Sequence, residues 1–573
     1  MSGFPLISVL TLVPFVGGLA VLVVGLASRR LGHPEAWKVP EPGEPPSPAL
    51  TGTLSPSEGE REGVRGLTRV ARPTAFQASG PGVLSLVRGL ALTFSLAVLA
   101  LAVAMWVHFN PASGGLQFEE SYAWIPILGI SYHVGVDGLG LLMVLLTAIV
   151  VPMAMLASGN IAERVPSYFA LVLFLQTGLF GTFTALNFFH WFVYWELSLI
   201  PAFFLIKLWG GPLRTSAATQ FFLYTMAGSV ALLLVFVAIL LATGKSDFLV
   251  LADMERSGEL IPRLSFYLGW HDLTTRRLAG LLFAGAFFGF AVKVPLMPFH
   301  SWLPAAYAEA PMGTTMLLTG LMSKMGVYGF LRILLPIFPE QAHWLLKPLL
   351  WLTVITIVCS AGAAFAQRDL KRMLAYSSIN HLGYCMLGTF ALLSPGQGAA
   401  APAVEQSAAL SGVLLQMFNH GITASTLFWM VGMLEARSGG LRGLDDFGGL
   451  RKPAPIFCGL MGIALFSSLG LPGLNGFVGE FLIFKGAFAL VTWATALSVL
   501  GLLITAIFLL TILQRVFSGP LNARWVKWPD LSVAERVKLA PAIALMFLLG
   551  IYPQAILGVV SSTVAKMVEQ LRF

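Results

Sequence analysis

Long apolar segments separated by short polar connectors run along almost the whole chain of 573 residues. Apolar runs of about 18 residues or more are typical of membrane-spanning helices. The pattern predicts about fourteen such segments, near residues 4–28, 83–108, 137–158, 166–187, 189–209, 216–243, 279–309, 312–336, 345–366, 373–393, 407–436, 453–490, 494–517 and 538–560. Two of these, 279–309 and 453–490, are too long for one straight helix and contain prolines and glycines, so we expect them to be broken.

The predicted fold is an all-α polytopic membrane protein with two inverted-topology repeats. Two broken helices with ionisable residues beside each break are the pattern expected of such repeats. The chain is predicted to begin with a first helix (1–28), a polar loop (29–82) and a group of N-terminal helices (83–158). A first repeat (159–336) and a second repeat (337–517) follow, and a connector with the last helix (518–573) ends the chain.

Composition excludes soluble enzymes, nucleic-acid-binding proteins and disordered scaffolds. Hydrophobic residues make up 57% of the chain and charged residues 11%, against about 45–50% and 25% in soluble domains. The net charge of +8 comes from Lys and Arg dispersed among the connectors. Cys359, Cys385 and Cys458 stand alone in apolar runs without the spacing of a metal or cluster site, so we expect no redox centre and no metal on this chain.

The distribution of basic residues predicts the orientation in the membrane. The connectors near 109–133, 337–344 and 394–406 carry no Lys or Arg, whereas the alternate connectors carry Arg164, Arg214, Arg368, Lys371, Arg372, Arg437, Arg442, Arg451, Lys452, Arg524 and Lys527. Cytoplasmic connectors are enriched in Lys and Arg, so both termini are predicted to lie outside. The Pro-, Gly- and Ser-rich loop 29–82 is predicted to be flexible and cytoplasmic.

Ionisable residues within apolar segments are the candidate functional residues, because a charge at mid-helix costs about 2.5–3.5 kcal/mol on the more lenient insertion scale. Glu196 lies about one-third of the way into its segment, and Lys293 lies deep in its segment just before Pro295 and Pro298. Each can be a proton site, or the two can form an ion pair that only holds helices together. Lys207, near a segment end, is predicted to be a snorkelling anchor.

Further candidates lie in the second half of the chain. Lys324 is mid-segment among small residues, whereas Arg332, two turns later, is predicted to be an interfacial anchor. Glu480 follows a glycine-rich break, beginning at Gly470, that is expected to unwind a helix at membrane depth. Three histidines in or beside the segments can each be core residues or proton carriers: His300, His381 and His420.

Four runs of sequence resemble one family. They are 195–206, beginning Trp-Glu-Leu-Ser-Leu-Ile-Pro; 292–304, Val-Lys-Val-Pro-Leu-Met-Pro-Phe-His-Ser-Trp-Leu-Pro; 374–383; and 476–481, Gly-Phe-Val-Gly-Glu-Phe. These runs look like the antiporter-like membrane subunits of proton-pumping NADH:quinone oxidoreductase (complex I), a family shared with multi-subunit cation/proton antiporters. The run 419–428, Asn-His-Gly-Ile-Thr-Ala-Ser-Thr-Leu-Phe, is most similar to the M type.

The resemblance implies roles for the candidate residues. Glu196 and Lys293 would form a buried pair that gates an inward half-channel, Lys324 would be the central relay, and Glu480 the outward exit residue, with His381 and His420 between them. It also implies a place in the bacterial inner membrane beside L-type and N-type subunits. Quinone reduction, flavin and iron–sulfur clusters would belong to partner subunits, and no nucleic acid is involved.

Two alternatives remain at this point, and one departure from the family stands out. The chain can instead be a subunit of a cation/proton antiporter, or a structural subunit that transports nothing. Many relatives carry Asp and His after Trp-Leu-Pro, where this chain has Ala305 and Tyr307, so a relay role at these two positions is in doubt.

The loop 29–82 is predicted to be cytoplasmic and dispensable for turnover, because it carries seven basic residues between Arg29 and Arg72 and little apolar sequence. A cysteine placed at Ser57 should resist an impermeant thiol reagent in intact cells and react after lysis. Rapid labelling from outside would contradict the predicted orientation.

Overall fold

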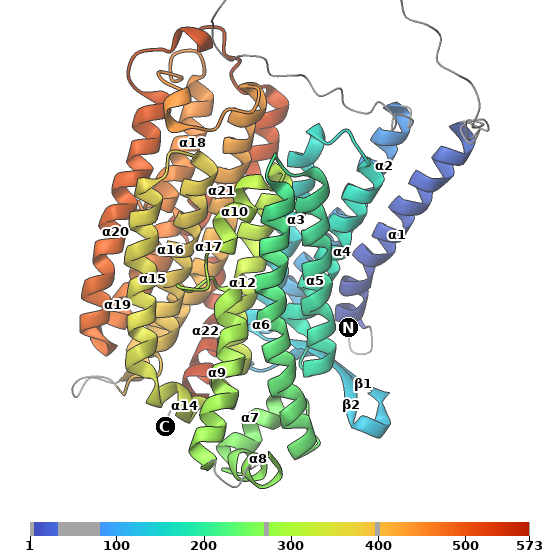
Figure 1. Ribbon diagram of the computed structural model, residues 1–573, viewed down its shortest axis with the longest axis vertical. Coiled ribbons are helices and arrows are strands. Elements are labelled where there is room, and N and C mark those ends of the chain that lie inside the picture. The colour runs from blue at the N-terminus through green and yellow to red at the C-terminus, as the bar shows by residue number, and fades with distance from the viewer. Residues whose placement is uncertain (1–4, 33–80, 269–273, 396–401, 572–573) are drawn as a thin grey trace, which may run out of the picture.

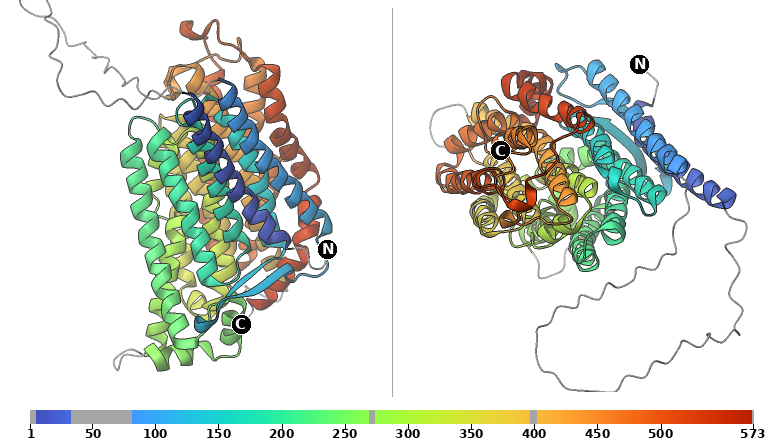
Figure 2. Two further views of the ribbon diagram at one scale, coloured as in Figure 1. Left: turned by 90° about the vertical axis from the view of Figure 1, so that its right-hand side faces the viewer. Right: turned by 90° about the horizontal axis from the view of Figure 1, so that it is seen from above.

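The apolar segments form a bundle of long helices in a computed structural model that describes residues 5–32, 81–268, 274–395 and 402–571 (Figure 1). The all-α polytopic fold is therefore confirmed. Most of the predicted loop 29–82 lies outside the described residues. Before the first repeat come α1 (Leu6–Gly32), α2 (Pro81–His108) and α3 (Gly138–Ala157), and α1 and α2 lie at the periphery of the bundle (Figure 2).

The core of the bundle consists of two sets of helices in the same order: three continuous helices, one broken helix and a closing helix. The first set is α4 (Val165–Thr184), α5 (Phe188–Trp209), α6 (Arg214–Thr243), the broken pair α9 (Thr275–Lys293) and α10 (Trp302–Glu309), and the span Met312–Ile337. The second is α15 (Leu346–Ala366), α16 (Leu370–Ala391), α17 (Pro402–Arg437), the broken pair α18 (Pro455–Ser468) and α19 (Asn475–Leu490), and α20 (Thr492–Ile512). Because α4 and α15 begin at opposite ends of the bundle (Figure 1), the two sets have inverted orientation.

The span Met312–Ile337 is not a regular α-helix. It consists of α11 (Met312–Leu317), a π-helical stretch η3 (Leu318–Met322), α12 (Ser323–Gly329), a second π-helical stretch η4 (Phe330–Leu334) and α13 (Leu335–Ile337). Shorter elements in the connectors are α7 (Phe248–Arg256), α8 (Leu260–Leu268), α14 (Pro339–Trp344), and the 3₁₀ turns η1 (Pro126–Leu128), η2 (Ser158–Asn160), η5 (Leu444–Asp446) and η7 (Ala523–Trp525); the π-helical stretch η6 (Leu513–Phe517) ends the α20 span.

Both predicted breaks are present, and each has a local cause. Pro295 and Pro298 lack the N–H that would continue α9, and the indole of Trp302 donates to the carbonyl of Val292 at 3.0 Å. Between α18 and α19, Gly470 and Gly473 adopt positive φ values of 79° and 92°, a conformation that glycine adopts without strain. The breaks therefore follow from residue types that the sequence already shows.

The prediction of a single last helix over 538–560 is wrong. The structure has two helices there, α21 (Val533–Ile551) and α22 (Gln554–Gln570), bent by 64° at the intervening residues. Ten helices among the described residues are long and apolar enough to cross a membrane, or eleven if this bent pair is one span. The count of fourteen stays a prediction.

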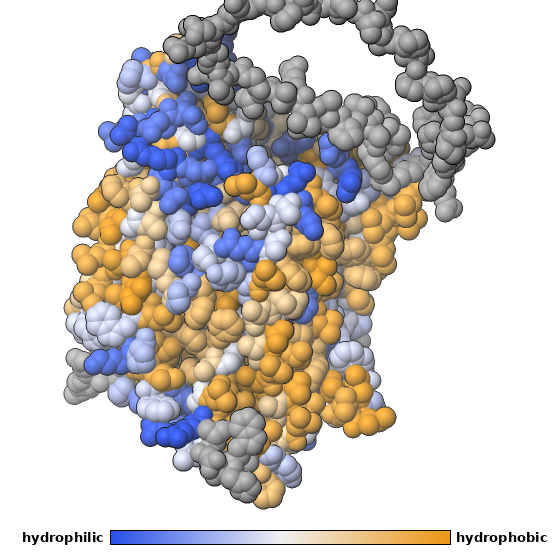
Figure 3. All heavy atoms as spheres, in the orientation of Figure 1, coloured by the Kyte–Doolittle hydropathy of each residue, from blue (hydrophilic) through white to orange (hydrophobic). Residues whose placement is uncertain are grey.

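The polar connectors gather at the two ends of the bundle, with a belt of apolar side chains between them (Figure 3). The connectors that carry the basic residues lie at the end near α18, whereas α1 begins and α22 ends at the opposite end, where α7 and the strands lie (Figure 1). We call the second end the hairpin end. The first and last described helices thus begin and end, respectively, at the same end of the bundle.

The hairpin end takes its name from two strands that the sequence pattern did not predict. β1 (Gln117–Ile125) and β2 (Ile130–Val136) pair antiparallel, mostly within the connector 109–133. Glu120 accepts a hydrogen bond from the backbone N–H of Ile7 at 2.8 Å, which fixes the hairpin to α1. His133 lies between two carboxylates, with Nδ1 2.5 Å from Asp247 and Nε2 2.9 Å from Glu119.

These carboxylates predict a pH-dependent attachment of the hairpin. The hydrogen bond to Asp247 raises the pKa of His133 above its usual value of 6.5, with a further contribution from Glu119 and with burial acting in the opposite direction. The imidazolium can donate to both carboxylates, so the contribution to stability is complete below about pH 6.5 and is lost as pH rises through the raised pKa. Amide hydrogen exchange in 117–136 should therefore accelerate as pH rises, beyond the intrinsic pH effect.

The variant His133→Gln should lose this dependence, whereas His108→Gln, which changes an exposed histidine of α2, should keep it. Equal protection of the hairpin in His133→Gln and the wild type at pH 6 would contradict the prediction.

Candidate functional site

Lys324 lies at the centre of the bundle, on α12 between the two π-helical stretches. Its side chain is fully buried. The ammonium Nζ contacts the carbonyl oxygen of Thr319 at 2.5 Å, Nδ1 of His420 at 2.7 Å and Oγ of Ser323 at 3.4 Å. π-Helical turns inside α-helices are frequent at functional sites. Here the carbonyl of Thr319, within the first π-helical stretch, accepts from the lysine.

The two predicted relay histidines lie next to each other. His420 on α17 and His381 on α16 have ring centroids 5.2 Å apart. His381 has acceptors at both ring nitrogens, since Nδ1 is 2.7 Å from the carbonyl of Ser377 and Nε2 is 3.0 Å from the carbonyl of Ser468. Only a protonated imidazole donates from both nitrogens, so this environment accommodates an imidazolium.

Glu480 completes the arrangement from α19, two turns beyond the glycine-rich break. Its Oε1 is 3.4 Å from Nε2 of His381 and accepts from the amide of Gln416 at 3.2 Å. Gly479 permits this approach, because a Cβ there would lie 3.0 Å from the backbone nitrogen of Gln416. Four buried residues from four helices thus form a continuous series, which we call the central row: Lys324, His420, His381 and Glu480.

Glu196 and Lys293 do not belong to the central row, and they do not form the direct ion pair that the resemblance implied. Lys293 is 2% exposed, and its Nζ has no hydrogen-bond partner among the described residues. It lies 4.8 Å from the ring centroid of Trp195. Oε1 of Glu196 is likewise buried without a partner. An ion pair with only an architectural role would require contact, which these two side chains do not make.

His300 also lies apart from the central row. It is partly exposed in the segment between α9 and α10, and its ring centroid is 6.1 Å from that of Tyr376 on α16. Its Nδ1 has no hydrogen-bond partner among the described residues. Lys207, by contrast, is exposed near the end of α5 and contacts the ring of Phe203, as expected of an anchor.

The prediction that Arg332 is an interfacial anchor is wrong. Its guanidinium Nη2 contacts Oδ1 of Asp137 at 2.5 Å, and the side chains are 11% and 6% exposed. Asp137 also accepts from the backbone N–H of Gly140 and so caps α3. Sequence reasoning missed Asp137 because it directly precedes an apolar segment, where an acidic residue is usually only a helix cap.

Tyr307 occupies one of the two positions at which the sequence departs from the family pattern. Its side chain is fully buried, and its hydroxyl donates to the carbonyl of Leu318 at 3.0 Å. Leu318 is the first residue of the π-helical stretch that precedes Lys324. Tyr307 therefore satisfies a carbonyl in the helix that holds the central lysine.

At the end opposite the hairpin, a second group of charges lines a cavity of about 510 Å³. Lys371 contacts Glu435 at 2.6 Å, and Arg442 contacts Glu309 at 3.0 Å and Asp369 at 2.5 Å. Lys371 and Arg442 were predicted only as connector charges. Arg442, in the connector after α17, thus joins α10 of the first repeat to the start of α16, and the Lys371–Glu435 pair joins α16 to α17. No group of three metal-ligating side chains occurs in the part of the chain that the structure describes.

A bundle with two broken helices and a buried Lys, His and Glu series defines an ion-transporting membrane subunit. Residues 185–505 match the family described as NADH:quinone oxidoreductase/Mrp antiporter, TM, and the chain belongs to this family. NADH-quinone oxidoreductase subunit M of Rhodobacter capsulatus is 34% identical over 494 residues, which cover 86% of this chain and 92% of that protein.

Two further comparisons agree with this assignment. The F(420)H(2) dehydrogenase subunit M of Methanosarcina mazei is 34% identical over 479 residues, covering 82% of this chain and 91% of that protein. Among solved structures, a chain of respiratory complex I from Thermus thermophilus with bound NADH superposes with a TM-score of 0.73 and 28% identity, covering 86% of this chain and 97% of that chain.

Proposed function

We propose that this chain is a proton-translocating membrane-arm subunit of an NADH:quinone oxidoreductase. The central row supports this proposal most directly. In it, Lys324, His420, His381 and Glu480 follow one another from α12 to α19. All four side chains are at least 92% buried. Ionisable groups at membrane depth are costly and mark functional sites, and such groups exchange protons when they lie within hydrogen-bonding reach or are bridged by one water molecule.

In this proposal the proton moves from the first repeat to the second. Glu196 and Lys293 act in the inward half, Lys324 passes the proton to the two histidines, and Glu480 releases it on the hairpin side. His300 acts as an accessory proton carrier at the α9–α10 break. Moving one charge against 100 mV costs about 2.3 kcal/mol, which is the free energy of a pKa change of just under two units. Rearranged contacts along the row can supply this amount.

The membrane and the partner subunits of this chain follow from the same assignment. Its membrane is the bacterial inner membrane, with both termini and the hairpin end outside. Its partners are the other membrane-arm subunits, including L-type and N-type subunits. Quinone is reduced elsewhere in the complex, and flavin and iron–sulfur clusters are held by partner subunits. The chain is thus part of an oxidoreductase without a redox centre of its own.

A second candidate function follows from the family itself, whose description includes Mrp antiporters. In that case the same row would exchange protons for a metal cation. Proton uptake driven by an imposed sodium gradient, without electron transfer, distinguishes this function from quinone-coupled pumping.

Replacement of Glu196 or Lys293 in the first repeat should impair both quinone reduction and proton pumping. We expect Glu196→Gln and Lys293→Ala each to lower quinone reduction and the accompanying ΔpH by about 100-fold, the typical contribution of a proton-transferring group. The measurements are NADH:quinone activity and ΔpH in membrane vesicles. Lys207→Ala, which removes an exposed lysine of α5, is the matched control, and normal pumping in both test variants would rule out the proposed gate.

Two variants of Glu480 distinguish a proton-carrying role of this residue from a purely structural role. A carrier must titrate, so Glu480→Asp should retain much of the pumping, whereas Glu480→Gln should lose about 100-fold. A structural role predicts the reverse order, because Gln keeps the length and can still contact Gln416 and His381. The measurement is ΔpH formation per NADH oxidised in complexes of confirmed subunit composition, and full activity of Glu480→Gln would exclude an obligatory carrier.

A further inference from the structure

Three polar side chains extend from the centre of the membrane toward the hairpin end along one span. Lys324, Tyr328 and Arg332 are four residues apart, so they lie on one face of the helix. The hydroxyl of Tyr328 donates to the carbonyl of Phe183 at 3.1 Å, and Cζ of Arg332 lies 5.8 Å from the Tyr328 ring centroid. Nζ of Lys324 points the other way, to the carbonyl of Thr319.

The Arg332 guanidinium is fixed by an acid from another part of the chain. Asp137 lies between β2 and α3 and contacts Arg332 at 2.5 Å, while its Oδ1 also accepts from Gly140 at 3.0 Å. The next residue, Gly138, donates from its backbone to Oγ1 of Thr563 on α22 at 2.9 Å. The ion pair therefore joins the span that carries Lys324 to the hairpin, to α3 and to the last helix.

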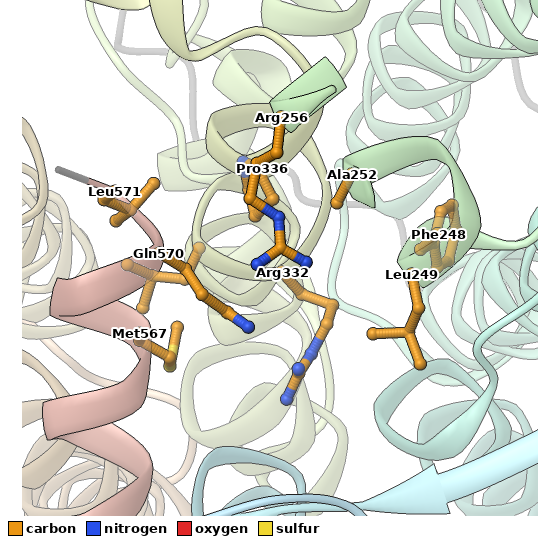
Figure 4. A pocket seen from close by; sticks show the side chains of 10 residues that line it. Phe248, Leu249, Ala252, Arg256, Arg332, Pro336, Met567, Gln570 and Leu571 are labelled. Atoms are coloured by element: carbon orange, nitrogen blue, oxygen red, sulfur yellow. The ribbon is translucent and has the colours of Figure 1, made fainter. Parts of the chain in front are cut away.

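Arg332 also lines a small pocket on the hairpin side. Figure 4 shows this pocket between α7, α22 and the Arg332 segment, and its volume is about 50 Å³, enough for one or two water molecules. Arg256 and Gln570 are the other polar side chains in its wall, with Pro336 and apolar residues around them. Nε of Arg332 has no hydrogen-bond partner among the described residues. Arg332 thus separates this pocket from Tyr328 and, one turn further, from Lys324.

We propose that the Asp137–Arg332 ion pair is a proton seal, which prevents Lys324 from exchanging protons with the hairpin side through the pocket. This inference rests on the proposed function. A guanidinium stays protonated in proteins, so it cannot carry a proton onward, and its ion pair with Asp137 holds it between the pocket and Tyr328. With this direct route closed, the proton on Lys324 passes to His420, which is 2.7 Å away.

Loss of the proton seal should let protons leak through the complex without electron transfer. In vesicles that contain the whole complex, without NADH, an imposed membrane potential should drive little proton flux in the wild type. Arg332→Gln removes the charge and shortens the side chain, so the flux should rise about tenfold or more, equivalent to a barrier lower by about 1.4 kcal/mol. A pH-sensitive dye inside the vesicles measures the flux. Arg256→Gln, which changes the other arginine of the pocket, should leave it unchanged.

A double variant shows whether the leak passes through the central lysine. Lys324→Ala combined with Arg332→Gln should return the flux to the wild-type level. Unchanged flux in an assembled Arg332→Gln complex would overturn the seal, and so would a leak that persists in the double variant, since that leak would reflect loosened packing. Should Arg332→Gln fail to assemble, Asp137→Asn, which releases the guanidinium from its counter-ion, is expected to raise the flux and is judged by the same criteria.

The two proposals can fail separately. Because passive flux is measured without turnover, a missing leak leaves the pumping results for Glu196, Lys293 and Glu480 as they stand. Conversely, normal pumping in those variants would refute the proton-carrying role whatever the leak measurements show.

Discussion

The bilayer core contains no bulk water to solvate a broken helix, so every backbone group that a break releases must find a partner inside the protein. In the second repeat one of these partners belongs to the central row, because His381 contacts the carbonyl of Ser468 at the end of α18. Across the break, Asn419 donates to the carbonyl of Asn475 at the start of α19. Asn419 is the neighbour of His420 in sequence. The break, the histidines and Glu480 thus depend on one another, and a change that closed the break would also disperse the row.

The two repeats meet this constraint in different ways. In the second repeat the titratable groups contact one another or backbone carbonyls. In the first repeat, Nζ of Lys293 and Oε1 of Glu196 are buried and have no hydrogen-bond partner among the described residues. A buried charge without a partner is costly, and the cost falls when an opposite charge approaches. The first repeat therefore has the larger electrostatic response to a small displacement, which suits a group that must change protonation state.

Much of the fold could be predicted from the sequence, because the apolar segments are long and the breaks have prolines or glycines. The same constraint identified Lys324, Glu480, His381 and His420, since charged or imidazole groups within apolar runs are costly. Contacts between helices could not be predicted: the sequence does not show that Asp137 meets Arg332, or that Lys293 and Glu196 stay apart. The hairpin was missed because the long apolar segments dominate the sequence pattern, although Ile130, Tyr132, Val134 and Val136 alternate with polar or small residues. The α21–α22 bend was missed because apolar residues continue on both sides of it, although Pro553 lies at the break.

The length of the continuous helix α17 allows a movement at either of its ends to reach its centre. This helix runs unbroken for 36 residues, from Pro402 to Arg437, a length of about 54 Å. Glu405 near one end is paired with Lys485 of α19, and Glu435 near the other is paired with Lys371, while His420 lies at the midpoint. A stiff rod held at its two ends acts as a lever, so a lateral shift of either end moves its centre by about half as much. A partner that pulls on one face of the membrane would thereby alter the distance between His420 and Lys324 without touching either residue.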